Sequence, residues 1–269
     1  MDLRPKEYFD QRATAEMERN LHIRERSPTE RLACACRIIG RQEEDAGLAG
    51  QISARSARGE DIYWTLRFGL GFDEANPEDF IEVDKDLHTI SGTGMANPAT
   101  RFHLWVYKAR PDINSIIHTH SPWASALAAT GQGITVAQMD MTPLYDDCAL
   151  LNQWPGVPIA DQEGVIISAA LGSKRSIILA NHGQLTTGRT IEEATFLSVI
   201  VERAARLQPR ATAYGPIQPV DGTLAKEAHD YLLQERHVFA TFDYWFRQVE
   251  RAEGGGASVE MNIVQVILC

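Results

Sequence analysis

The feature that most constrains the fold is the segment SIIHTHS at positions 115–121, where an apolar strand runs into the start of a helix. Alternate side chains of a strand point to one side, so His118 and His120 are expected to project together. Ser121 followed by Pro122 is typical of a helix start. Two alternating histidines alone are more often structural than metal ligands. The pair therefore needs a third group to indicate a site.

That third group is His182, which ends a second apolar segment, SIILANHG, at positions 176–183. In open α/β sheets, ligands bind at the carboxyl ends of strands. Three neutral imidazoles can hold a divalent cation and leave coordination positions for a substrate. The sequence therefore predicts a metal site formed by His118, His120 and His182. Three nitrogens suit zinc, manganese or iron, and we expect one divalent ion per subunit, manganese or zinc.

Helix and strand patterns alternate along the chain and predict an α/β protein with one mixed sheet covered by helices on its faces. Capping residues and apolar periodicity predict helices at positions 28 to about 45, 98–110, 122–130 and 191 to about 207, and a long helix over 224–249. Strand patterns occur at 50–56, 61–68, 112–120 and 176–183, with hairpins at 80–90, turning at Lys85 and Asp86, and at 183–189.

Composition excludes two classes of partner. The chain of 269 residues carries 26 basic and 36 acidic residues, a net charge of -10 that argues against nucleic-acid binding. It has neither a signal-like start nor a run of about 20 apolar residues, so we expect no membrane association and a cytoplasmic location. Four cysteines with neither disulfide nor zinc spacing are expected to be reduced. We expect one domain over 1–250 and a glycine-rich linker with an apolar tail over 251–269.

Three stretches of this sequence resemble the class II aldolase/adducin family: GLAGQISAR, FHLWVYKARPDINSIIHTHSP and ILANHGQLTTGRTIEEA. The resemblance implies a three-layer α/β/α sandwich with a mixed, largely antiparallel central sheet. It also implies a homotetramer with active sites at subunit interfaces, and it implies that His118, His120 and His182 bind the metal.

The departures from the family pattern bear on the reaction. Sugar-phosphate aldolases of the family carry P-S-S-E before R-F-H, whereas this chain has ANPATRFH, with Ala99 at the glutamate position and Asn97 and Pro98 at the serine positions. The family's phosphate-binding asparagine is Gln51 here. The phosphate ligands and the proton-abstracting carboxylate are both absent. Decarboxylation follows the same electron flow as aldol cleavage but needs an acid rather than a base.

The chain as a whole is most similar to the decarboxylase branch of the family. This resemblance implies a small aromatic substrate, a hydroxylated aromatic or heteroaromatic ortho-dicarboxylate. The substrate that the resemblance implies best is 3-hydroxy-2-methylpyridine-4,5-dicarboxylate, an intermediate of vitamin B6 (pyridoxal) degradation. Two alternatives stay open: an aldolase or epimerase acting on a sugar phosphate, and an adducin-like binding module without catalytic activity.

Four further side chains are candidates for substrate binding or catalysis. Arg101 is expected either to hold a substrate carboxylate or to form a surface ion pair. His103 lies about 200° further around the same helix and is either a proton donor or a buried structural histidine. Gln51 and Ser53 are candidates to bind a substrate carboxylate where relatives bind phosphate, or are ordinary strand ends.

Two other groups have structural interpretations. Tyr145, Asp146 and Asp147 are expected in a solvated turn, and Tyr231, Phe242, Tyr244 and Trp245 in the core or at a subunit interface.

Overall fold

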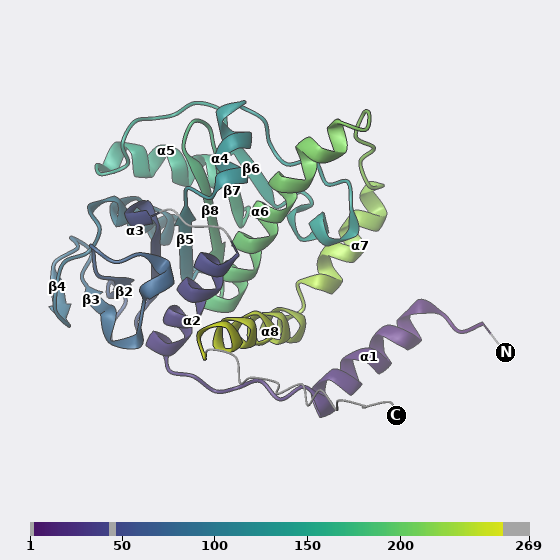
Figure 1. Cartoon of the computed structure of the whole chain (residues 1–269), viewed down its shortest axis with the longest axis horizontal. Helices are drawn as coiled ribbons and strands as arrows, with labels where there is room; N and C mark the ends of the chain where they lie inside the picture. The colour runs from purple at the N-terminus through teal and green to yellow at the C-terminus, as the bar shows by residue number, and fades with distance from the viewer. Residues whose placement is uncertain (1–2, 43–46, 255–269) are drawn as a thin grey trace, which may run out of the picture.

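The computed structural model describes residues 3–42 and 47–254 and confirms the predicted three-layer α/β/α architecture (Figure 1). Within the described residues an eight-stranded sheet has the order β4-β3-β2-β1-β5-β8-β7-β6. Among these eight described strands, β6 and β7 are the parallel neighbours and every other neighbouring pair is antiparallel. The strands are β1 (Gln51–Arg55), β2 (Tyr63–Leu66), β3 (Phe80–Val83), β4 (Thr89–Ser91), β5 (Ser115–Thr119), β6 (Cys148–Leu151), β7 (Ser176–Leu179) and β8 (Gly183–Gly188).

Helices cover both faces of the sheet. On one face α3 and α5 pack against Ile116 of β5 and Leu185 of β8. On the other face α2, α4, α6 and α8 pack against Ile52 and Ile117. The helices are α1 (Lys6–Asn20), α2 (Pro28–Arg41), α3 (Arg101–Ala109), α4 (Pro122–Ala129), α5 (Asp161–Leu171), α6 (Ile191–Thr212), α7 (Gly222–Leu232) and α8 (Glu235–Glu253). No helix in the described part of the chain is both long and apolar enough to span a membrane.

Several predicted elements are corrected. The long helix predicted over 224–249 is two helices, because Leu233 and Gln234 leave the helical conformation between α7 and α8. The predicted hairpin at 183–189 is a single central strand, β8, paired with both β5 and β7. The helix that begins after Thr190 runs through Pro209 to Thr212 instead of ending near 207.

Two boundaries also differ from the predictions. Asn97 accepts a hydrogen bond from the amide of Ala99, but the residues after it form a 3-10 turn, Pro98–Thr100, before α3 begins at Arg101. Helix α2 ends at Arg41 rather than near 45. Helices α1 and α5 and strand β6 were not predicted, and α1 buries no residue. The glycine-rich linker and apolar tail were predicted over 251–269, and the part of this segment after position 254 lies outside the described residues.

The topology brings the predicted site together. β8 lies between β5 and β7 and is antiparallel to both, so β5 and β7 run in the same direction and end at the same edge of the sheet. His120 follows the end of β5, and His182 lies in the turn between β7 and β8. The two histidine segments, about 60 residues apart in the sequence, therefore meet at one edge.

Candidate metal centre

His118, His120 and His182 form a compact cluster. Their ring centroids are 5.0 Å apart for His118 and His120, 4.6 Å for His118 and His182, and 4.7 Å for His120 and His182. One ring nitrogen from each lies within 4.8 Å of the others. This spacing fits three nitrogen ligands around a single cation, each about 2.0–2.1 Å from the ion.

The ring nitrogens are in the state that a metal requires. Nδ1 of His118 lies 2.7 Å from the backbone oxygen of Gln184. Because a carbonyl oxygen only accepts, Nδ1 carries the proton and Nε2 presents its lone pair. The Nε2 atom of His120 is buried and has no hydrogen-bond partner among the described residues.

Burial and crowding keep the three imidazoles neutral. Burial, with a smaller effect of the neighbouring histidines, holds the pKa of His118 well below its usual value. Burial and the nearby His120 lower the pKa of His182 to about 4, and burial also lowers the pKa of His120. Neutral imidazoles have the free lone pairs that a cation needs, so these residues fit a divalent metal ion.

Glycine at position 183 permits the close approach of the two histidine segments. A Cβ atom at Gly183 would clash with the backbone oxygen of Thr119 and lie 3.3 Å from His120. Asn181 adopts a left-handed conformation, with φ of 57°, in the turn just before His182. The N-H-G sequence therefore has a local structural reason: asparagine tolerates the turn and glycine admits the neighbouring strand.

His103 lies in a buried polar chain and is close enough to His118 to contribute to lowering the pKa of that histidine. Its side chain is fully buried, and Nδ1 lies 2.8 Å from the hydroxyl oxygen of Ser53. That hydroxyl is 3.0 Å from the hydroxyl of Tyr107. Burial lowers the pKa of His103 to about 3, so the ring is neutral. Its Nε2 atom has no hydrogen-bond partner among the described residues. Tyr107 stands four positions after His103, a helical spacing that the sequence analysis did not use.

Gln51 and Ser53 have different surroundings. Gln51 is the cross-strand partner of His118, so the two side chains lie on the same face of the sheet. Its Nε2 donates to the backbone oxygen of Ala49, whereas Oε1 is buried without a partner among the described residues. Ser53 is fully buried and bonded to His103 and Tyr107. Ser53 is therefore not placed to bind a substrate carboxylate as predicted, while Gln51 lies beside the histidines.

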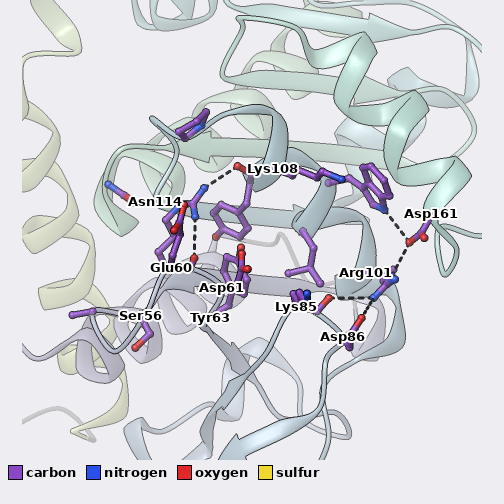
Figure 2. Close-up of a pocket in the computed structure, with 17 residues that line it drawn as sticks. Ser56, Glu60, Asp61, Tyr63, Lys85, Asp86, Arg101, Lys108, Asn114 and Asp161 are labelled. Atoms are coloured by element: carbon purple, nitrogen blue, oxygen red, sulfur yellow. Dashed lines mark hydrogen bonds and ion pairs between the residues drawn. The ribbon is translucent and has the colours of Figure 1, made fainter.

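Arg101 points away from this cluster. Its guanidinium bonds Asp161 at 2.9 Å, lies 3.7 Å from Asp86 and donates to the backbone oxygen of Lys85 at 3.2 Å (Figure 2). These residues line a cavity of about 1110 Å³, and none of the three clustered histidines lines it. The geometry favours the ion-pair interpretation of Arg101 over the substrate-binding one.

We expect Arg101→Ala to have a small effect. The side chains of the pair with Asp161 are 27% and 55% exposed, and such pairs contribute about 0.2–1 kcal/mol to stability. Unfolding in urea should show a loss in that range, and metal affinity and KM should stay close to wild type. A KM raised tenfold or more at unchanged stability would instead place the guanidinium on the substrate.

Other predicted groups have structural roles. Asp147, expected in a solvated turn, is buried and pairs with Arg175 and His229. Phe242 and Trp245 belong to the core, and Tyr244 is exposed. A second group with metal-like spacing, Asp84, Asp86 and His88, lies in the exposed β3–β4 turn.

Comparisons with known proteins identify the family of this chain. Residues 30–209 match the family model described as class II aldolase and adducin N-terminal domain. A 4-hydroxy-3-prenylphenylpyruvate oxygenase/4-hydroxy-3-prenylbenzoate synthase of Streptomyces roseochromogenus subsp. oscitans is 29% identical over 67% of this chain and 66% of its own length. Decarboxylase NovR of Streptomyces niveus is 29% identical over 67% of each chain.

A solved structure gives the same result for the fold. The L-fuculose 1-phosphate aldolase from Glaciozyma antarctica PI12 has a TM-score of 0.76 and 29% identity, covering 84% of this chain and 89% of the aldolase. The family model spans more than half of the sequence, and the sheet order and histidine cluster occupy the region it matches. This chain belongs to the class II aldolase and adducin family.

Proposed function

We propose that this protein is a divalent-metal-dependent decarboxylase acting on a hydroxylated aromatic or heteroaromatic ortho-dicarboxylate. The observation that carries the proposal is a cluster of three neutral histidines in a chain that has Ala99 where aldolases of the family have their glutamate. A site that can bind a cation but has no carboxylate base at that position suits bond cleavage that ends with protonation. The relative named as a decarboxylase supports the same class of reaction.

The residues have distinct roles in this proposal. His118, His120 and His182 hold the ion, which supplies Lewis-acid stabilisation of negative charge on the substrate. The Oε1 atom of Gln51, which has no partner within residues 3–42 and 47–254, accepts a hydrogen bond from a substrate hydroxyl or a protonated ring nitrogen. As the carbon–carbon bond breaks, its electron pair stays on the ring carbon and carbon dioxide leaves. The carbon then takes a proton.

We assign that proton to Nε2 of His103. If Tyr107 donates to Ser53 and Ser53 donates to Nδ1, the proton of the neutral imidazole resides on Nε2, which has no hydrogen-bond partner in the described part of the chain. Solvent replaces this proton after each turnover. The hydrogen bond between Ser53 and Nδ1 holds the imidazole in one orientation.

The finer assignments also belong to this proposal. We propose 3-hydroxy-2-methylpyridine-4,5-dicarboxylate as the substrate, because it offers a hydroxyl beside a carboxylate for chelation. We propose manganese or zinc as the ion, and a homotetramer with sites at subunit interfaces as the assembly. The unpaired thiols of Cys34 and Cys36 support a reducing compartment, which we propose is the cytoplasm.

A sugar-phosphate aldolase or epimerase is the second candidate, and the structural likeness to an L-fuculose 1-phosphate aldolase favours it. The side chain of Asn97, which stands at a serine position of the aldolase motif, is already occupied. Its amide nitrogen donates to the oxygen of Leu48 at 3.1 Å, and its oxygen accepts from Ala99 at 3.0 Å. Asn97 is therefore a poor phosphate ligand. An adducin-like module without catalytic activity is the third candidate.

The decisive experiment measures carbon dioxide release by protein loaded separately with Mn²⁺, Zn²⁺ and Fe²⁺. The substrates are 3-hydroxy-2-methylpyridine-4,5-dicarboxylate, a dihydroxyphthalate and L-fuculose 1-phosphate. We expect the protein to release carbon dioxide from an aromatic dicarboxylate in the absence of molecular oxygen. This activity should be lost when the metal is removed by a chelator and restored when the metal is added back. Retro-aldol cleavage of the sugar phosphate would establish the second candidate, and inactivity on all substrates would support the third. Release only with Fe²⁺ and oxygen would indicate an oxygenase, the activity named for one relative.

A further inference from the structure

The helix that follows the two strand histidines is not capped by the residue predicted from the sequence. The side chain of Ser121 makes no capping hydrogen bond to α4. Its hydroxyl instead accepts a hydrogen bond from the side-chain amide of Gln184, at 3.0 Å. The free amides in the first turn of α4 must therefore find another acceptor, because buried unpaired amides are costly.

That acceptor is Glu202, from the middle of α6. One carboxylate oxygen accepts from the amide of Trp123 at 2.9 Å, and the other accepts from the amide of Ala124 at 2.8 Å. Pro122, the first residue of α4, has no amide hydrogen, so these are the first two amides of the helix that can donate.

The Glu202 carboxylate is buried, with the residue 3% exposed. Within residues 3–42 and 47–254 its carboxylate takes part in no ion pair, and its two oxygens accept from the amides of α4. Its charge is balanced by the two amide hydrogen bonds and by the positive end of the α4 dipole.

The first turn of α4 contacts the chain at all three histidines. His120 lies two residues before Pro122, so the start of α4 sets its backbone position. The hydroxyl of Ser125 donates to the backbone oxygen of His182 at 3.3 Å. Gln184, whose side chain holds Ser121, also supplies the backbone oxygen that accepts from Nδ1 of His118. Displacing this turn would therefore displace the metal-binding nitrogens relative to one another.

We propose that Glu202 is a positioning residue for the metal centre: it fixes the first turn of α4 and through it the spacing of His120 and His182. This inference rests on the proposed metal-binding function. Outer groups that orient metal ligands typically change metal affinity by about 10–100-fold when they are replaced. Glu202 acts through backbone rather than through a ligand's ring nitrogen.

Glu202→Gln is the most informative substitution because it preserves shape. A glutamine offers one oxygen acceptor and one NH2 donor to two amide donors, so one amide of α4 loses its partner and faces another donor. We expect the Kd for Co²⁺ or Zn²⁺ to rise about 10–100-fold. Glu202→Asp keeps the charge on a shorter side chain and should restore part of the affinity.

Thr190→Ala is the matched control. Thr190 caps the start of the same helix, α6, by accepting from the amide of Glu193 at 3.1 Å, beside the end of β8 away from the histidines. It should lower stability by about 1 kcal/mol and leave metal binding unchanged. A purely structural role of Glu202 predicts the same pattern for both variants: a lower Tm with an unaltered Kd.

The experiment combines competitive metal titration, the visible spectrum of the Co²⁺ form and thermal unfolding of the full chain. Weaker binding and an altered Co²⁺ spectrum in Glu202→Gln, with partial recovery in Glu202→Asp and neither change in Thr190→Ala, support the proposal. Unchanged Kd and spectrum in Glu202→Gln overturn it. If Glu202→Gln does not fold, an unchanged Kd and spectrum in Glu202→Asp overturn it instead. A wild-type protein that binds no metal overturns the proposed function itself, which is a separate result.

Discussion

Replacing His118 with alanine is expected to abolish metal binding and to lower kcat/KM for decarboxylation by at least about 10³-fold. Lewis-acid stabilisation contributes several kcal/mol to such reactions, and each 1.36 kcal/mol is tenfold in rate. His118 is central because it is the most buried of the three histidines and its ring is oriented by the carbonyl of Gln184. Metal content per chain and the initial rate of carbon dioxide release measure the two effects.

Two companion variants serve as controls. One separates loss of metal from loss of stability, and the other tests whether the Asp84, Asp86 and His88 group in the β3–β4 turn binds the metal instead. His182→Ala removes a ligand that is only partly buried, so it should lose metal with a smaller loss of stability than His118→Ala. His88→Ala removes the exposed histidine of the β3–β4 group and should keep both metal and activity. Metal retained in His118→Ala and lost in His88→Ala would move the binding site to that turn and contradict the proposal.

Local sequence patterns predicted the histidine site because each part of it is short in sequence. The alternation of a strand places His118 and His120 together, and the apolar run before His182 marks a second strand. The convergence of the two segments depends on β8 lying between β5 and β7, which periodicity does not encode. The family resemblance supplied that step.

The residues that support the site were harder to predict because their contacts are long-range. Glu202 reaches α4 across about 80 residues of sequence, and Ser53 meets His103 across 50. The spacing rules that find an N-cap select Ser121, whose hydroxyl is in fact held by Gln184. The break at Leu233 was missed for a different reason: the apolar period over 224–249 continues through both flanking helices, so it does not mark where one ends and the other begins.

His103 is the residue whose role the sequence left most open, and its surroundings lead to the second large prediction. We expect His103→Gln to lower kcat by about 10²–10⁴-fold, the range for removal of a general acid, while the metal content stays at the wild-type level. The physical reason is that, among the residues the structure describes, Nε2 is the polar side-chain atom of Ser53, His103 and Tyr107 that has no hydrogen-bond partner. The measurements are single-turnover formation of the protonated monocarboxylate product and metal analysis of the same preparation.

Tyr107→Phe is the control for this prediction, because it keeps the ring that stacks on Tyr63, with centroids 4.8 Å apart, and removes only the hydroxyl that reaches Ser53. It should lower kcat much less than His103→Gln, since the imidazole and its hydrogen bond to Ser53 both remain. Wild-type kcat in His103→Gln would make His103 a structural residue. Loss of metal in that variant would instead identify His103 as a fourth metal ligand or as a residue that supports one of the ligands. Because a proton donor is needed only after carbon dioxide departs, the expected variant still binds substrate and metal but forms the protonated product slowly.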